Sequence, residues 1–334
     1  MQVPQTFEWI DVENGKCTVS SSREFRYDYQ NHQFQCFILD DDESVRFFAG
    51  YGIFDKNKIE ETFVYPEEVE YRGKKYVVRE IQEDVITEWH CGDLSKKSIV
   101  YPKALRKLDV SNELSHLELP ESLEHLSLWY FKGKSLKLPA SLLNIGQIYN
   151  CPNLESLEIP EGVKSIGSIS KTDKWKSLVV PSSVTSIGTV RESAFRSIVF
   201  KPGSPIVKLP EYFASESKQL REVILPDHLQ AVGNGAFSRC YNLTSISIPS
   251  SVKEIGGSAF EECYVLRVVN IDKDSQLEDI GWAFRYCTSL EHFEIPESMQ
   301  GISAHAFEGC KSLVSVEIPN TVTSIGWYAF NGCI

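Results

Sequence analysis

The sequence predicts an α/β solenoid, in which short parallel strands and short helical turns stack coil upon coil. Three observations lead to this prediction. A template of 23 to 24 residues recurs in the C-terminal third of the chain, and a shorter strand-plus-proline element recurs through the middle. In addition, 42% of the 334 residues are hydrophobic and 24% are charged, so there is enough apolar material to fill a long core.

The regular coils occupy residues 219–334, where the template is L-x-x-[IVF]-x-[IL]-P-x-x-[VL]-x-x-[IV]-G-x-x-A-F-x-x-C. The segment from Leu243, LTSISIPSSVKEIGGSAFEEC, is one example. The template's alanine recurs at intervals of 23, 24, 23 and 23 residues, at Ala236, Ala259, Ala283, Ala306 and Ala329. This period lies within the roughly 20 to 29 residues of leucine-rich repeats, so each template is expected to form one coil of a right-handed superhelix.

Each part of the template has a structural interpretation. L-x-x-I-x-I alternates apolar and polar positions as a strand does, and the proline ends its hydrogen-bond ladder. The glycine after V-x-x-I suits a tight turn or a positive φ. A-F-x-x-C places apolar residues at i, i+1 and i+4, which predicts a short helical turn. Stacking the coils would merge these positions into one continuous core.

The middle of the chain carries shorter, degenerate coils up to about residue 218. Their strand-plus-proline elements are SIVYP (98–102), HLELP (116–120), SLKLP (135–139), SLEIP (156–160), SLVVP (177–181) and SIVFKP (197–202). Residues 65–86 are predicted to form the first coil, with Gln82, Val85 and Ile86 in place of Gly, Ala and Phe. We therefore expect a leucine-rich-repeat solenoid over residues 63–334 and a β-rich N-terminal cap over residues 1–62, which do not fit the period.

The template resembles the BspA-like leucine-rich repeats of bacterial surface proteins, which also occur in some mucosal protists. The resemblance is most specific where I-G-x-x-A-F-x-x-C recurs, and GKKYVVREI is similar to openings in that family. It implies a secreted or surface-anchored protein of host-associated bacteria, in a family with members linked to adhesion to host matrix or to other cells. The family has no catalytic residues to carry over, so the resemblance implies a non-enzymatic binding module.

Composition and motifs argue against several other classes of function. A net charge of −12 disfavours nucleic acid and acidic membrane surfaces as ligands. No apolar stretch approaches the roughly 18 residues of a membrane span, and the N-terminus lacks the pattern of a signal peptide, so a cytoplasmic location stays open. No catalytic or cofactor fingerprint occurs, and neither a cofactor nor a metal is predicted. The histidines considered are expected at the surface: His116, His125, His228, His292 and His305.

The cysteines and one acidic run each allow a structural and a chemical interpretation. The sequence has nine cysteines, and six share one template position: Cys151, Cys240, Cys263, Cys287, Cys310 and Cys333. Neighbouring coils would allow disulfides, but we expect a reduced core column, because cysteine is often buried as a free thiol and the positions are repeat-equivalent. The acidic run Asp40-Asp41-Asp42-Glu43 is expected to be a solvated turn, since it lacks the spacing of a calcium loop.

The outward positions of the main strands form the candidate binding site for a protein or glycan. They are Val179, Val199, Ile224, Ser247, Asn270, Glu294 and Glu317. The first three would form an apolar stripe on adjacent strands. Two interpretations remain open: a partner-binding surface, or β-branched residues that merely favour strands.

Three functions follow from these patterns. An adhesin-like surface module is favoured, an intracellular scaffold is the alternative, and an enzyme is least favoured. The sequence stops at Gly332-Cys333-Ile334, directly after A-F-x-x-C, with no polar cap visible. Self-association through this last coil is therefore a further expectation.

Overall fold

A computed structural model describes residues 10–12, 15–21, 23–30, 32–49, 62–83, 98–111 and 113–333. The chain divides into two compact units, Met1–Ile145 and Gly146–Ile334, and each is described by itself. The described residues form strands, turns and bends, and no helix occurs among them. The expected boundary at residue 62 stays a prediction.

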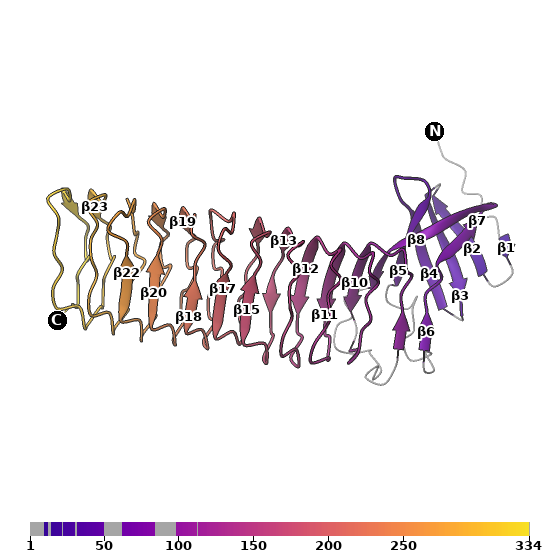
Figure 1. The fold of residues 1–334 in the computed structure, drawn as a ribbon, viewed down its shortest axis with the longest axis horizontal. Coiled ribbons are helices and arrows are strands. Elements are labelled where there is room, and N and C mark those ends of the chain that lie inside the picture. The colour runs from indigo at the N-terminus through magenta and orange to yellow at the C-terminus, as the bar shows by residue number, and fades with distance from the viewer. Residues whose placement is uncertain are drawn as a thin grey trace. The chain divides into compact units, whose positions relative to one another are not determined.

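The strands of the first unit are short and numerous. They are β1 (Ile10–Val12), β2 (Gly15–Ser21), β3 (Glu24–Tyr29), β4 (His32–Ile38), β5 (Ser44–Ala49), β6 (Thr62–Val64), β7 (Glu68–Tyr71), β8 (Lys74–Glu83), β9 (Ser98–Val100), β10 (Lys107–Ser111) and β11 (His125–Trp129), while β12 (Asn144–Tyr149) crosses the division between the units. From β1 to β5 neighbouring strands are antiparallel, whereas β5, β8, β10 and β11 pair in parallel. Figure 1 shows this change in strand direction at β5 and β8.

Aromatic side chains fill the core beside β3, β4 and β5. Phe25 stacks on Tyr71 with ring centroids 4.3 Å apart, and Phe34 stacks on Phe47 at 5.1 Å. All four side chains are buried. The aromatic-rich composition of this part of the chain is thus explained by packing.

Residues 65–86 differ from the coil predicted for them. β7 and β8 form an antiparallel hairpin that turns at Arg72 and Gly73, whose φ angles are 52° and 74°. Two consecutive residues with positive φ are the geometry of a tight hairpin turn. The C-terminal part of β8 then lies between β5 and β10 and pairs in parallel with both. Val85 and Ile86 lie outside the described residues.

The second unit is a solenoid of stacked parallel coils. Its strands are β13 (Ser165–Ile166), β14 (Ile169–Ser170), β15 (Ser177–Val180), β16 (Ser186–Ile187), β17 (Ser197–Phe200), β18 (Glu222–Ile224), β19 (Ala231–Val232), β20 (Ser245–Ile248), β21 (Glu254–Ile255), β22 (Val268–Ile271), β23 (Gly301–Ile302) and β24 (Ser324–Ile325). The main strands β15, β17 and β18 pair in register, as do β20 and β22. The shorter strands pair as β13–β16, β19–β21 and β23–β24. Figure 1 shows the coils following one another in chain order.

The helical turns predicted for A-F-x-x-C are wrong: these segments are successive tight turns. In the coil that starts at Leu220, Ala236 N–H donates to Gly233 O and Cys240 N–H to Phe237 O, both three residues back. Phe237 N–H instead donates to Ala259 O of the next coil, at 2.7 Å. Gly235 and Arg239 have φ angles of 61° and 60°, and left-handed residues interrupt a right-handed helix. The spacing of the apolar residues could not distinguish the two geometries, because Ala, Phe and Cys are buried both in a helical turn and in a run of tight turns.

The glycine after V-x-x-I lies at a tight turn, which is one of the two predicted roles: Ala236 N–H donates to Gly233 O, and Gly281 has a φ of 49°. At Gly233 and Gly256 the reason for glycine is different from a positive φ. Neither Gly233 nor Gly256 has a positive φ. A Cβ on Gly233 would lie 2.6 Å from the carbonyl carbon of Pro210, and one on Gly256 would lie 2.7 Å from the Asn234 nitrogen. Glycine is therefore needed because adjacent coils pack backbone against backbone.

Columns of identical side chains form the core of the regular coils. Phe237, Phe260, Phe284, Phe307 and Phe330 stack in sequence, with ring centroids 5.4, 5.3, 5.8 and 5.4 Å apart. Their interplanar angles are 11°, 3°, 6° and 10°. The alanine and phenylalanine of the first four of these coils are fully buried. The shared core predicted from the repeat is thus present, while its right-handed winding stays a prediction.

Candidate functional site

The apolar stripe of the candidate site lies on three adjacent strands. Val179 on β15 is the register partner of Val199 on β17, which is the partner of Ile224 on β18. Val179 is 42% and Ile224 is 47% exposed, and Val199 is half-buried. The alternate residues of these strands point into the core: Leu178, Ile198 and Val223 are buried. The sequence pattern therefore placed these three side chains correctly, next to one another on the outer surface of the sheet.

The next two candidate residues, Ser247 and Asn270, extend this surface with polar side chains. Ser247 on β20 and Asn270 on β22 are register partners, and the Asn270 amide donates to Ser247 Oγ at 3.1 Å. Both line a groove of about 600 Å³ together with Ile224. The groove also contains Asp227 and Asp272. The stripe is thus continuous with a hollow that carries hydrogen-bonding groups.

The last two candidates, Glu294 and Glu317, are exposed but lie on segments without a named strand. Both line a second groove, of about 420 Å³, together with His292. Ile271 and Asp272 line both grooves, so the two hollows adjoin. The structure therefore joins all seven candidates into one surface, which we call the sheet-face site.

Sequence reasoning missed two residues of this surface. Asp272 follows Ile271 at the template's proline position, and the loss of that proline was the available signal. Val268 begins β22 and is 45% exposed, in the second outward row of the strands. The sequence pattern also places Val268 outward, in a row of positions two residues before the candidates, but this row is mostly serine and was not chosen as part of the site.

The cysteine column makes a ladder of thiol hydrogen bonds, and its members are buried except Cys333, which is half-buried. Each Sγ donates to a carbonyl of the preceding coil: Cys240 to Ala214 O at 3.3 Å, Cys263 to Phe237 O at 3.2 Å, Cys287 to Phe260 O at 3.1 Å, Cys310 to Phe284 O at 3.2 Å and Cys333 to Phe307 O at 3.3 Å. All five are free thiols. Burial raises the pKa of Cys263 and of Cys310 to about 12, which keeps both protonated and unreactive at neutral pH.

Cys151, the sixth member, is also buried, and its Sγ lies 3.6 Å from the Tyr149 carbonyl oxygen. This contact lies within its own coil.

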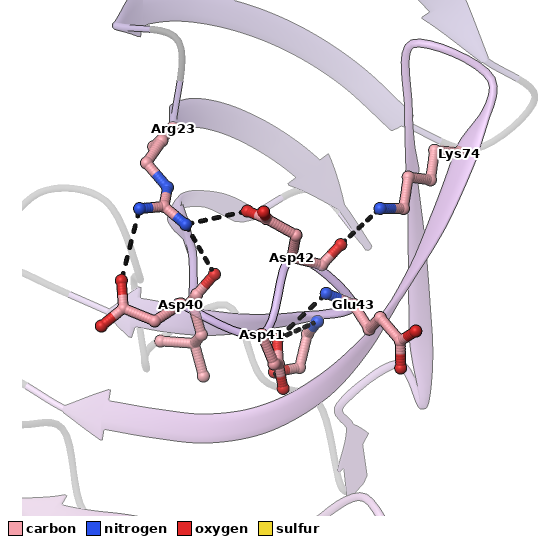
Figure 2. Close-up of polar contacts among 8 residues, drawn as sticks. Arg23, Asp40, Asp41, Asp42, Glu43 and Lys74 are labelled. Carbon is pink, nitrogen blue, oxygen red and sulfur yellow. Dashed lines mark hydrogen bonds and ion pairs between the residues drawn. The ribbon is translucent and has the colours of Figure 1, made fainter.

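The acidic run forms the turn between β4 and β5 (Figure 2). The Arg23 guanidinium binds Asp40 at 3.3 Å and Asp42 at 2.8 Å. Asp41 accepts hydrogen bonds from the Ser44 hydroxyl at 2.6 Å and from the backbone N–H of Ser44 and Glu43. These bonds, the Ser44 hydroxyl first, lower the pKa of Asp41. The Asp41 carboxylate therefore stabilises the turn, and those of Asp40 and Asp42 form ion pairs with Arg23.

The five histidines considered in the sequence do not converge on a reactive group. His116, His125, His228 and His292 are exposed, whereas His305 is half-buried, pairs with Glu308 at 2.8 Å and stacks on Tyr328. Over the described ranges, no group of three or more His, Cys, Asp or Glu side chains could hold a metal ion. The described part of the chain also contains no helix with the length and apolar character that a bilayer span requires.

Parallel coils of this period, built on columns of leucine, isoleucine and phenylalanine, define a leucine-rich-repeat protein. The description "BspA type Leucine rich repeat region" matches residues 98–199 and 207–334, in six copies. The match covers more than half of the chain, which therefore belongs to the BspA-type leucine-rich repeat family. Repeats of this kind are in general non-enzymatic scaffolds that bind proteins.

Solved structures are similar to the chain in fold. The pneumococcal vaccine antigen PcpA aligns with a TM-score of 0.57 and 16% identity, over 90% of this chain and 85% of that one. A leucine-rich repeat protein from Bacteroides ovatus aligns with a TM-score of 0.34 and 20% identity, over 90% of this chain and 91% of that one. No curated protein matches the chain by sequence. At these identities the likeness to PcpA concerns the fold alone.

Proposed function

We propose that the protein is an adhesin-like binding module that captures a protein partner through the sheet-face site. The observation that carries the proposal is the continuity of the surface. An apolar stripe of three in-register side chains leads into two adjoining grooves lined by polar and acidic groups. Interfaces commonly combine an apolar centre with a polar rim, and solenoids supply extended surfaces of this kind.

The exposure of the stripe sets the scale of its contribution. Burying a whole isoleucine or valine side chain contributes about 1.5 to 3 kcal/mol. Val179 and Ile224 are already roughly half buried, at 42% and 47% exposure, so covering the remainder contributes about 1 kcal/mol each. The stripe alone thus supports weak capture, and the grooves must supply the rest of the affinity and the specificity.

The test is capture of immobilised fibronectin, laminin and collagen by the purified chain. The double variant Val199→Asp, Ile224→Asp is expected to lose about 100-fold or more in affinity, because a partner would have to desolvate two carboxylates. Val207→Asp is the matched control, since Val207 is 48% exposed and lies outside both grooves of the site. Unchanged capture by the double variant, with the same melting temperature as the control, would contradict the proposal.

We further propose a location on the cell surface, which the family resemblance supports. Protease treatment of intact cells, followed by detection with an antibody against the repeats, should remove the protein while leaving a cytoplasmic marker intact. Protection of the protein until the cells are lysed would instead support the alternative, an intracellular scaffold.

Self-association is a separate part of the proposal. In the last described coil Ile325 is 50% and Trp327 is 82% exposed, whereas Ile255 and Ile302, the equivalents of Ile325 in earlier coils, are buried. A second copy packing against this surface would bury both. Sedimentation velocity over a concentration series should then show a dimer that Trp327→Lys abolishes, and a monomer at every concentration would contradict it.

A further inference from the structure

A third groove, apart from the two of the sheet-face site, lies on the side of the coils formed by the A-F-x-x-C turns. It has a volume of about 610 Å³ and belongs to the second unit. Tyr212 and Trp282, which line it, are 50% and 52% exposed. Exposed aromatic rings that gather in one hollow are typical of an interaction site, so these two rings point to a ligand.

The two rings lean over the coils that separate them. Between Tyr212 and Trp282 the intervening coils carry only Gly235, Gly257 and Ser258 at the matching positions. A Cβ on Gly235 would lie 2.7 Å from Cδ1 of Tyr212, and one on Gly257 would lie 2.5 Å from Nε1 of Trp282. The small residues thus leave room for both rings and form the floor of the groove. Tyr212 and Trp282 lie three coils apart, and neighbouring coils are spaced by about 4.8 Å, so the groove extends about 14 Å from one residue to the other.

The rest of the lining is polar and nearly balanced in charge. Arg191 and Arg239 supply two positive groups, and Glu216 and Glu261 supply two negative ones. Arg239 is itself paired with Glu216 at 3.6 Å and with Glu262 at 3.5 Å. A groove with this balance has no net field that would select an anion or a cation.

Several hydrogen-bonding groups in the groove have no protein partner. Within the part of the chain that the structure describes, this holds for the Tyr212 hydroxyl, the Trp282 indole N–H and the Ser258 hydroxyl, whereas the Asn234 amide donates to Glu211 at 3.1 Å. Leucine, isoleucine and valine are absent from the lining residues, all of which are described. An amphipathic helix, which needs an apolar groove, is therefore a poor fit, whereas a proline-rich peptide, which docks on aromatic rings, is the competing ligand that the test includes.

We propose that this groove binds a neutral, linear oligosaccharide of a few pyranose units. A pyranose ring has a face of C–H groups that packs on an aromatic ring, and a rim of hydroxyls that donate to carboxylates and accept from guanidinium, indole and amide groups. Three features of the groove match that chemistry. They are the two exposed aromatic rings, the equal number of positive and negative side chains, and the hydrogen-bonding groups without a protein partner. The site is separate from the sheet-face site and does not depend on the protein-binding role proposed for it.

The test is isothermal titration calorimetry with cellotetraose and tetra-N-acetylchitotetraose, accompanied by tetragalacturonate and a proline-rich peptide as competing chemistries. Binding of at least one neutral tetrasaccharide is expected. Trp282→Ala and Tyr212→Ala should each weaken it at least tenfold, and Trp282→Phe should restore part of the affinity. Tyr264→Ala is the matched control, because Tyr264 is an aromatic side chain that is 41% exposed and lies outside the groove.

Further outcomes separate this site from the sheet face. The Val199→Asp, Ile224→Asp variant should bind the tetrasaccharide as the unmodified chain does. The inference is overturned if neither neutral tetrasaccharide binds, if both aromatic variants bind normally with unchanged melting temperatures, or if the acidic sugar or the peptide binds in preference.

Discussion

Replacing Phe260 with alanine is expected to destabilise the repeats more than the same change at Phe330. Phe260 is fully buried and stacks between Phe237 and Phe284, at centroid distances of 5.4 and 5.3 Å. Removing a buried phenylalanine costs about 3 to 5 kcal/mol, from lost transfer free energy and the cavity that remains. Phe330 in the last described coil is half-buried and stacks on Phe307 alone. Its loss should therefore cost about half as much, roughly 2 kcal/mol.

Urea unfolding followed by circular dichroism and by tryptophan fluorescence measures this difference. Long repeat arrays can unfold in more than one step, so the two probes must be compared before a free energy of unfolding is assigned. The Phe260→Ala transition should move to clearly lower urea than the Phe330→Ala transition. Equal shifts for the two variants, or a loss below about 1 kcal/mol for Phe260→Ala, would contradict a shared core in which each ring packs between two others.

Three other predictions follow from the same coils. The pKa of Cys263 is about 12 in the folded chain, against an ordinary value of 9.0. Between these two values the unfolded state binds fewer protons than the folded state, so the free energy of unfolding falls as pH rises. Urea midpoints measured at about pH 8, 9.5 and 11 should therefore fall less for Cys263→Ala than for the unmodified chain. Gly233→Ala should cost about 1 to 3 kcal/mol in the same assay, because its Cβ would meet the Pro210 backbone at 2.6 Å, and a neutral result would contradict close coil packing. Ser258 has a φ of 58°, in the left-handed region. Ser258→Gly should therefore raise the free energy of unfolding by about 0.5 to 1 kcal/mol, whereas Ser258→Val should lower it. The opposite order would refute the left-handed backbone conformation of this residue.

The strands of the solenoid could be predicted because their side chains alternate and their repeats align. Period-2 alternation is read from sequence alone, and the template fixed which residue of one coil lies beside which of the next, as at Val199 and Ile224. The stripe of the sheet-face site was predictable for the same reason. Its grooves were not, because they depend on how Asp227 and Asp272 lie around the ends of the strands.

The turn side of the coils could not be predicted, for a physical reason. A helical turn and a run of tight turns bury the same positions, so Ala236, Phe237 and Cys240 suit both. What decides between them is the partner of each backbone N–H, and Phe237 N–H donates to the next coil. The groove between Tyr212 and Trp282 depends on that geometry, so the sequence pattern gave no sign of it.

Disulfide trapping across the main strands is the most direct test of in-register stacking. Val199 and Ile224 are exposed or half-exposed register partners on β17 and β18, and neighbouring strands lie about 4.8 Å apart, within the range of disulfide Cα distances. Mild oxidation of the Val199→Cys, Ile224→Cys variant, read by mass spectrometry of unreduced peptides, should give a rapid cross-link. The Val179→Cys, Ile224→Cys variant, two strands apart at about 9.6 Å, should not cross-link. Cross-linking of the second pair in preference to the first would contradict the stack.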